Sequence, residues 1–178
     1  HYCKTDVIGS LSFFNSDNNE IMKGFADNEF DVAIVDPPYA VGASDGTFGN
    51  KGIYTQRGKK MEHYANHDKC PEKEYFDELF RVSKNQIIWG ANYFTEYLKP
   101  TKAWIFWYKG QNDLTMSDGE MAWTSFSKVT RQVTINRAEL IKQNTFHPTE
   151  KPVKLYKWLL SNYANEGDKI LDTHLGSG

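Results

Sequence analysis

The sequence predicts an α/β fold, with a mixed, mostly parallel sheet covered by helices on both faces. Short apolar segments rich in β-branched and aromatic residues recur along the chain, and segments with helical spacing lie between them. The 178 residues suit one domain with a substantial core. No linker, repeat or low-complexity stretch divides the sequence. We therefore expect a single domain spanning residues 1–178.

The predicted strands are short and differ in how much they bury. Residues 31–36, DVAIVD, form a continuous apolar run, which is typical of a buried central strand. Residues 103–109, AWIFWYK, are apolar on both faces, whereas residues 128–135, KVTRQVTI, alternate as a half-exposed strand does. Two further predicted strands are NQIIWG at 85–90 and GDKILD at 167–172.

Two longer helices are predicted, each beginning at a proline. Pro71 is followed by acidic residues, which favour the start of a helix. Its apolar stripe is Tyr75, Phe76, Leu79 and Phe80. The helix after Pro152 has apolar positions at Val153, Tyr156, Leu159, Leu160 and Tyr163.

Three segments between these elements are less regular. Residues 91–98, ANYFTEYL, predict a short helix. Residues 117–126, SDGEMAWTSF, predict a helical turn that leads to a sheet edge. Residues 40–70 have many glycines and little periodicity, so we expect a long loop, and such loops are usually functional or disordered.

Composition limits the partners of the protein. The formal net charge of −2 argues against a histone-like polycation. Residues 127–157 nevertheless carry seven basic and two acidic side chains, and residues 37–69 carry five and three. Local basic segments fit an anionic partner such as nucleic acid, although solvated loops explain them equally well. Aromatic residues make up 15% of the chain, and flat rings can stack on bases.

The two cysteines, Cys3 and Cys70, form neither a disulfide framework nor a metal-binding pattern. We expect both to be reduced thiols in a cytoplasmic protein. No apolar run reaches about 18 residues, so no membrane span is predicted. The first residues also lack the pattern of a signal peptide.

The motif DPPY, Asp36 to Tyr39, directly follows the predicted buried strand. A residue before proline is held extended, so Asp36 should project at the edge of the sheet. Neither Pro37 nor Pro38 has a backbone N–H, so their carbonyls are acceptors without neighbouring donors. A carboxylate and a carbonyl together suit an amino group with two N–H donors, and Tyr39 can lie flat against the ring that carries it. The alternative is a rigid turn with an aromatic plug.

Two further motifs each have a functional and a structural interpretation, and the residues alone do not distinguish between the two. In ILDTHLGSG, a strand ending in Asp172 runs into a Gly-x-Gly turn, where ligands of open α/β sheets bind. In HPTEKP, residues 147–152, Thr149 could cap the following helix, and a helix start also binds carboxylates.

These three motifs, in this order, resemble those of the amino-group DNA methyltransferases that use S-adenosylmethionine. The catalytic motif precedes the cofactor motif, as in the permuted branch called the β class. The resemblance spans nearly the whole chain and implies a Rossmann-like methyltransferase fold. It also implies a site-specific enzyme that methylates the exocyclic amine of adenine in DNA, because DPPY favours adenine in this family.

The resemblance implies a role for each matching residue. Asp36 and the Pro37 carbonyl, with Pro38 beside them, would hold the target amine, and Tyr39 would stack on a base flipped from the duplex. The residues implied to bind S-adenosylmethionine are Asp17, Thr149, Lys151, Asp172, Gly176, Ser177 and Gly178. Thr149 and Lys151 would lie near its methionine end and Asp17 near its adenine.

Target recognition should fall to residues 40–70 and 127–146. The candidates for phosphate or base contacts are Arg57, Lys59, Lys60, Arg131 and Arg137. The expected partner is double-stranded DNA, with no metal and no membrane. A dimer and a companion restriction enzyme are left open. The alternatives are a cytosine-N4 methyltransferase, an inactive DNA-binding fragment, and a methyltransferase acting on RNA or a protein amide.

The sequence departs from the family pattern at two places. His174 stands where Phe is common, and Thr173 where Pro is common. In the family the glycine turn leads into a helix and a further strand whose acidic end holds the ribose, and the sequence stops at Gly178. On this ground we expect residues 1–178 alone to bind S-adenosylmethionine weakly or not at all.

Overall fold

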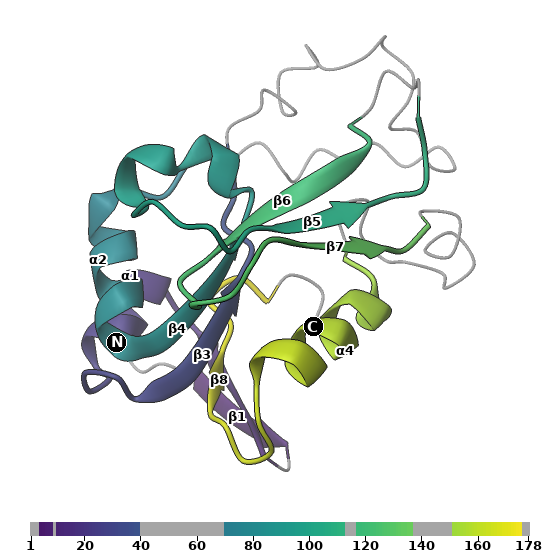
Figure 1. Cartoon of the computed structure of the whole chain (residues 1–178). Helices are drawn as coiled ribbons and strands as arrows, with labels where there is room; N and C mark the ends of the chain where they lie inside the picture. The colour runs from purple at the N-terminus through teal and green to yellow at the C-terminus, as the bar shows by residue number, and fades with distance from the viewer. Residues whose placement is uncertain (1–3, 9, 40–69, 113–116, 137–150, 176–178) are drawn as a thin grey trace, which may run out of the picture.

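A six-stranded mixed sheet forms the body of the protein (Figure 1). The structure, a computed structural model, describes residues 4–8, 10–39, 70–112, 117–136 and 151–175. The strand order is β7-β5-β6-β4-β3-β8. The strands are β3 (Phe30–Val35), β4 (Ser83–Trp89), β5 (Ile105–Tyr108), β6 (Gly119–Thr124), β7 (Arg131–Thr134) and β8 (Ile170–Leu171).

Only β6 runs against the other five strands. β3 is parallel to both β4 and β8, and β5 is parallel to β7, while β6 pairs antiparallel with β4 and β5. The carboxyl ends of five strands therefore meet at one edge, here called the carboxyl edge, together with the amino end of β6. The predicted mostly parallel mixed sheet is confirmed.

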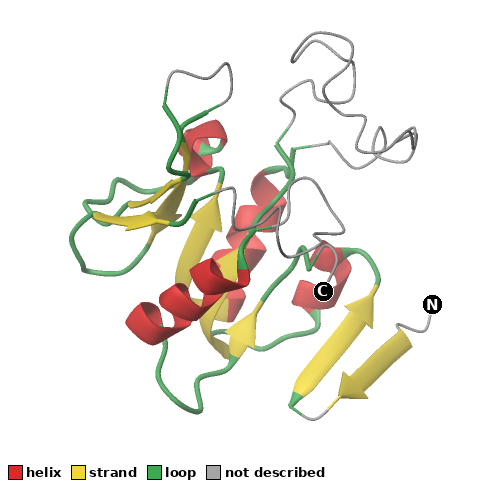
Figure 2. Cartoon of the chain, turned by 90° about the vertical axis from the view of Figure 1, so that its right-hand side faces the viewer, coloured by secondary structure: helices red, strands yellow, loops and turns green. Residues whose placement is uncertain are grey.

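Helices cover both faces of the sheet, as predicted (Figures 1 and 2). Helix α2 (Lys73–Val82) packs on Ala33 and Val35 of β3, and helix α4 (Val153–Tyr163) packs on Val32 and Ile34. This division follows from the period of two in a strand, which sends successive side chains to opposite faces. All four of these side chains are at most 3% exposed, because both faces of β3 are covered.

The two helices match their predicted apolar stripes to different degrees. In α2, Tyr75, Phe76 and Leu79 are buried as expected. In α4, whose N-cap is Pro152, the buried side chains are Leu155, Leu159 and Tyr163. The predicted positions Val153 and Leu160 are wrong, since they are 56% and 41% exposed. Leu155 was missed because the pattern was aligned on Val153, two positions earlier.

One predicted element has the wrong type. Residues 117–126 were expected to form a helical turn, but Gly119–Thr124 is β6, between β4 and β5 in the sheet. Ala122 and Trp123 are buried on opposite faces, as the alternation of a strand requires. The segment 91–98 forms two short 3₁₀ turns, Ala91–Tyr93 and Thr95–Tyr97, instead of one helix.

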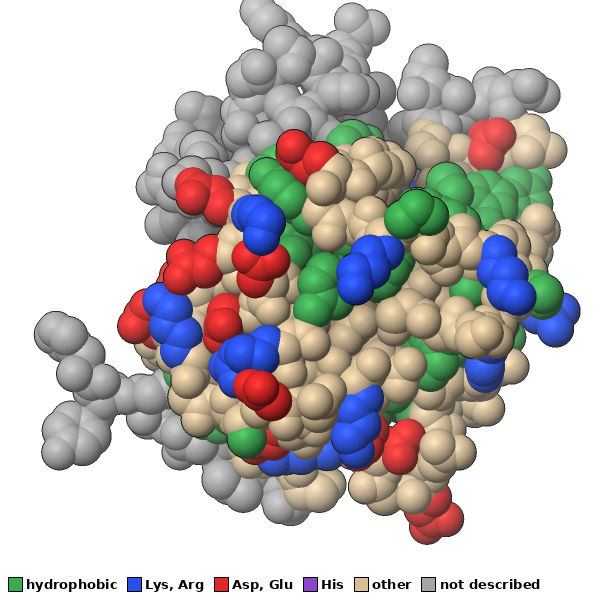
Figure 3. Space-filling model, turned by 60° about the vertical axis from the view of Figure 1, so that its left-hand side comes forward, with side chains coloured by type: hydrophobic (Ala, Val, Ile, Leu, Met, Phe, Trp, Pro, Cys, Tyr) green, Lys and Arg blue, Asp and Glu red, His purple; other side chains and the backbone are tan. Residues whose placement is uncertain are grey.

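The amino-terminal part adds a small hairpin and a short helix. β1 (Lys4–Ile8) and β2 (Leu11–Asn15) pair antiparallel as a separate two-stranded sheet. Helix α1 (Asn18–Lys23) lies beside α2, to which Lys23 is joined through Glu74 at 3.1 Å. Figure 3 shows acidic and basic side chains interspersed over one face of the molecule. In the described residues, no helix is long and apolar enough to cross a membrane.

Candidate active site at the carboxyl edge

Three carboxylates gather at the carboxyl edge, on the face that α4 covers. Asp36 follows β3 with the parity of Val32 and Ile34, and Asp172 follows β8. Glu120, near the start of β6, lies opposite Trp107 in the ladder with β5. The three carboxylates are close enough to interact: the charge of Glu120 raises the pKa of Asp36, and the charge of Asp36 raises the pKa of Asp172. Strand alternation and the reversed direction of β6 therefore bring these residues together.

Lys151 joins two of these carboxylates from the approach to α4. Its ammonium is paired with Asp36 Oδ2 and lies 3.3 Å from Glu120 Oε2. The same ammonium sits 5.4 Å from the ring centre of Trp89, on the last residue of β4. Glu120 Oε1 is held in turn by Lys109 Nζ at 2.7 Å. The side chain of Lys151 is only 3% exposed, so its charge has little water to solvate it.

The pKa values of the carboxylates depend on how burial and these cations balance. Burial raises the pKa of Asp36, and Lys151 opposes this shift only in part. Burial also raises the pKa of Asp172, against the hydrogen bond that its carboxylate accepts from the backbone of His174. Burial acts on Glu120 in the same direction, but Lys151 and Lys109 outweigh it, so the pKa of Glu120 is lowered.

The other oxygen of Asp36 has no partner among the described residues. Asp36 Oδ1 is buried, and no hydrogen bond donor of the described chain reaches it. The next two residues are prolines, which cannot supply a backbone N–H. A buried carboxylate oxygen without a donor is costly, since each unmet hydrogen bond to a charged group carries a desolvation penalty. An orphaned acceptor of this kind is suited to a ligand that brings its own N–H.

Tyr39 lies in a nest of aromatic rings close to Asp36. Its ring stacks on Tyr93, with centroids 4.7 Å apart and planes inclined by 7°. Phe94 meets it edge-on at 6.5 Å. Burial raises the pKa of the Tyr39 hydroxyl, with smaller contributions from Glu120 and Asp36. Gly90 makes room for the ring: a Cβ atom at this position would come within 2.6 Å of Tyr39.

The strand-end residues of β8 form a chain of hydrogen bonds. Thr173 Oγ1 lies 2.7 Å from the hydroxyl of Tyr75 and 2.8 Å from His174 Nδ1. The amide of Asn18 donates to His174 Nε2 at 3.0 Å, so the neutral ring carries its proton on Nδ1. Burial lowers the pKa of His174 to about 4. Thr173 and His174, the two residues that depart from the family pattern, are thus hydrogen-bonded to each other, and they link β8 to α2 and α1 respectively.

The predicted site residues are only partly brought together. Asp36, Lys151 and Asp172 lie at the carboxyl edge, with Tyr39 beside Gly90. Asp17 is the N-cap of α1 and accepts from Asn19 N at 2.9 Å. Arg131 is exposed at the first residue of β7, the end of that strand away from the carboxyl edge. The candidates outside the described residues are Arg57, Lys59, Lys60, Arg137, Thr149, Gly176, Ser177 and Gly178.

Sequence reasoning missed Glu120 and Lys109, the acid and the base that complete the charge network. Glu120 was missed because its segment was assigned to a helical turn. The pattern carried little signal, because residues 119–123, GEMAW, do not alternate polar and apolar side chains. Tyr156 was predicted only as a core position. Burial raises the pKa of its hydroxyl first, and Asp172, Asp36 and Glu120 raise it further.

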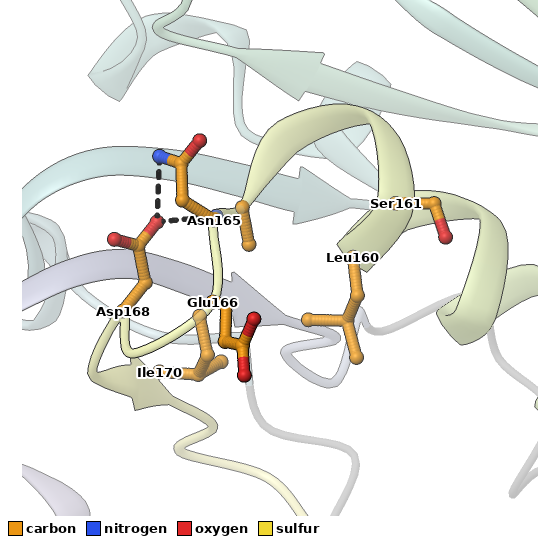
Figure 4. A pocket seen from close by; sticks show the side chains of 7 residues that line it. Leu160, Ser161, Asn165, Glu166, Asp168 and Ile170 are labelled. Carbon is orange, nitrogen blue, oxygen red and sulfur yellow. Dashed lines mark hydrogen bonds between the residues drawn. The ribbon is translucent and has the colours of Figure 1, made fainter.

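A surface hollow of about 440 Å³ lies elsewhere. Leu160 and Ser161 of α4, Ile170 of β8, and the turn between them line it (Figure 4). Asn165 and Asp168 close that turn, with the Asn165 backbone N–H donating to Asp168 at 2.8 Å. Because this hollow is open and lies at the amino end of β8, we place the site at the carboxylates instead.

A family model described as DNA methylase, N6_N4_Mtase, matches residues 53–178, more than two thirds of the sequence. The chain belongs to this DNA methylase family. The predicted resemblance to the DNA methyltransferases that act on adenine N6 or cytosine N4 is therefore confirmed. The match includes Glu120, Lys151 and Asp172, while Asp36 and Tyr39 precede it.

Two known proteins are similar to this DNA methylase family member. The type II methyltransferase M.HpaI of Haemophilus parainfluenzae is 25% identical over 202 residues, covering 88% of this chain. The chain spans about three fifths (61%) of that relative's length. A putative DNA modification methylase from Thermus thermophilus, solved with S-adenosyl-L-methionine, has a TM-score of 0.49 at 14% identity. That likeness covers 88% of this chain and 77% of the other.

Proposed function

We propose that this chain carries the catalytic site of a DNA methyltransferase. The site would transfer a methyl group from S-adenosylmethionine to the exocyclic amine of adenine. The observation that carries the proposal is the buried Oδ1 of Asp36, which has no hydrogen bond partner among the described residues and lies directly before two prolines at the carboxyl edge. Membership of the DNA methylase family supports it independently.

An aromatic amine fits the acceptors at this position. Its two N–H groups would be held by the Asp36 carboxylate and the Pro37 carbonyl. An aryl amine is a poor nucleophile because its lone pair is delocalised into the ring, and holding both hydrogens favours a pyramidal nitrogen. Fixed alignment then supplies much of the rate. Because burial raises the pKa of Asp36, its carboxylate is also a better proton acceptor than an exposed aspartate.

The charge of the described site fits S-adenosylmethionine. Three carboxylates, Asp36, Asp172 and Glu120, face two ammonium groups, Lys109 and Lys151, which leaves one negative charge in excess. When bound, S-adenosylmethionine supplies a methyl group that is already activated by a sulfonium cation. A cation beside Asp172 would offset the burial that raises the pKa of this carboxyl. We assign Asp172 and the residues that follow it to the cofactor.

Tyr39 is proposed to stack on the flipped base. Its ring already takes a parallel aromatic partner, Tyr93, which is 52% exposed. Base flipping is required because an amine inside the duplex cannot reach the methyl donor. Arg57, Lys59, Lys60, Arg131 and Arg137 remain candidates for DNA contacts. Adenine is preferred over cytosine on the resemblance of DPPY alone. The absence of a metal stays a prediction, and a dimer is left open.

The test is to incubate the full-length gene product with labelled S-adenosylmethionine and unmethylated DNA, then to identify the methylated nucleoside after digestion. We expect N6-methyladenine. Asp36→Ala should lower the methyl-transfer rate by about 10²–10³-fold, the loss typical of removing a group preorganised for the transition state.

The comparison variant is Asp31→Ala, which removes a carboxylate from the other end of the same strand, β3. It should leave the rate within a few-fold of the parent. Label in N4-methylcytosine would show the alternative base. Label in RNA or protein only, or full activity of Asp36→Ala, would contradict the proposal.

A further inference from the structure

The two oxygens of Asp36 are in different situations, and this asymmetry has a chemical consequence. Oδ2 is paired with Lys151, whereas Oδ1 is buried without a donor among the described residues. We propose that Lys151, tethered by Glu120, is a positioning residue that holds Oδ2 and reserves Oδ1 for the target amine. This inference rests on the proposed function and assigns the roles of two residues within that site.

The contacts of Lys151 favour a permanent role over a temporary one. A primary ammonium also resembles the target amine, so Lys151 could instead occupy the amine's place until DNA arrives. Leaving would strip Glu120 of one of its two cations and remove the ammonium from its place over Trp89. It would also take from Asp36, whose side chain is only 26% exposed, the counter-charge that it has in the described structure. A buried charge that loses its partner is strongly disfavoured, so we assign Lys151 to stay.

Glu120 fixes where the ammonium sits. It comes from β6, which among the described strands of the sheet is the one whose amino end lies at the carboxyl edge, so it approaches Lys151 from a separate strand. Lys109, just after β5, holds the other oxygen of Glu120 at 2.7 Å. The series Lys109, Glu120, Lys151, Asp36 thus alternates in charge across three strands and the approach to α4. Each member fixes the next, and the last one, Asp36, presents an oxygen that no donor in the described part of the chain reaches.

This arrangement does two things for the reaction. It fixes the rotation of the Asp36 carboxylate, which decides where the amine nitrogen is held. It also keeps Asp36 more ionised than burial alone would allow, since the ammonium opposes the effect of burial. An ionised carboxylate is the stronger acceptor of an amine N–H. Among the described residues, the titratable groups that interact electrostatically with Asp36 are Lys151, Glu120, Asp172 and the hydroxyls of Tyr39, Tyr75 and Tyr156.

The main test uses Lys151→Met, which keeps the length of the side chain and removes the charge. The full-length protein is first used to map its methylated sites in a host that lacks DNA methylation. Single-turnover methyl transfer is then measured from about pH 5.5 to about pH 9 on a synthetic duplex that carries a mapped site. Loss of an adjacent cation should move the acid limb of the rate profile up by about 1–3 pH units. We expect the maximal rate to fall at least tenfold and the Kd for the duplex to change less than threefold.

Two further variants keep the test decisive if Lys151→Met folds poorly. Lys151→Arg retains the cation and should restore the position of the acid limb, although not the full rate. Glu120→Gln keeps the shape and one acceptor, and should lower the rate without a large change in Kd. The matched control is Lys84→Met, which breaks a lysine–aspartate pair at the start of β3. Its rate profile should equal that of the parent.

An unshifted acid limb in Lys151→Met would overturn the proposal. So would a faster rate or tighter binding of the duplex, because removal of a temporary occupant would have that effect. Titration of the Asp36 carboxyl by ¹³C NMR, assigned with Asp36→Asn, provides a readout without DNA. A higher Asp36 pKa in Lys151→Met supports the pairing. If the parent protein transfers no methyl group to DNA, the proposed function fails, whereas the NMR titration still decides the role of Lys151.

Discussion

Strand β3 carries a lysine-paired aspartate at each end, and the two pairs behave in opposite ways. At its start, Asp31 accepts from Lys84 at 2.6 Å, and the two side chains are 31% and 55% exposed. This hydrogen bond lowers the pKa of Asp31. At its end, Asp36 is paired with Lys151, yet burial raises the pKa of Asp36. Partner type and strand are the same, but burial is the largest influence on Asp36, whereas Asp31 also accepts a hydrogen bond from the backbone N–H of Lys169.

The difference shows what each end of the sheet can do. The Asp31 pair is screened by water and links neighbouring strands at the surface, where such pairs contribute little. The Asp36 pair holds charge where water is scarce, which costs stability but strengthens every contact with a charged or polar ligand. Perturbed titration in this setting is typical of functional sites.

The largest expected contrast is between the two lysines. Lys151→Met should lower the free energy of unfolding by roughly 3 kcal/mol, near the lower bound for removing one partner of a buried ion pair. Lys84→Met should leave the unfolding midpoint nearly unchanged, because its pair is exposed. Urea titration followed by circular dichroism measures both. Equal losses in the two variants would show that the Asp36 pair is no more buried than the Asp31 pair.

A substitution at Gly90, the residue after β4, probes the packing at the carboxyl edge and not its charge. Gly90 has a φ of 65°, and a Cβ atom there would come within 2.6 Å of Tyr39. Gly90→Ala should cost about 1–2 kcal/mol from the left-handed backbone alone, and it should also slow methyl transfer by moving Tyr39. Gly167 has a φ of 90° with open space around it. Gly167→Ala should therefore lose stability but keep its activity, and loss of activity in both variants would refute the Tyr39 contact.

Asp172 provides a change expected to stabilise the protein. Burial raises the pKa of Asp172, so its charge is unfavourable at neutral pH in the ligand-free protein. Asp172→Asn keeps an oxygen for the His174 backbone N–H and should gain about 1 kcal/mol, as substitutions at strained functional positions often do. S-adenosylmethionine affinity, measured by calorimetry, should fall. Asp31→Asn is the counterpart and should not stabilise, because its charge is favoured by Lys84.

The contrast between the two ends also shows what the sequence could reveal. The run DVAIVD predicted β3 and its burial, because a strand covered on both faces must be apolar throughout. Asp36 and Asp172 stood out because each is an acid at the end of such a run. Glu120 did not, since its role depends on β6 running antiparallel into the same edge, a tertiary feature. The face of α4 was misjudged for a similar reason: Val153 and Leu155 are equally apolar, and only the sheet decides which is buried.

Of the predicted changes, substitution of His174 should have the smallest effect on stability, and this effect should depend on pH. Burial lowers its pKa to about 4, against about 6.5 in an unfolded chain. Between these values the unfolded state binds a proton that the folded state does not, so His174 makes stability fall as pH drops from about 6.5 to about 4. The buried carboxyls oppose this, because the pKa values of Asp36 and Asp172 are raised and their protonation favours the folded state.

His174→Gln cannot ionise but can still bond to Asn18 and Thr173, the two partners of the imidazole. The variant should therefore lose less stability than the parent between about pH 6.5 and about pH 4.5, as measured by urea midpoints at intervals of about half a pH unit. His174→Phe should show the same flatter profile from a lower starting stability, because the amide of Asn18 then has no acceptor in that ring. A pH dependence equal to the parent's in both variants would mean that His174 is accessible to water and that the bridge from β8 to α1 does not bury it.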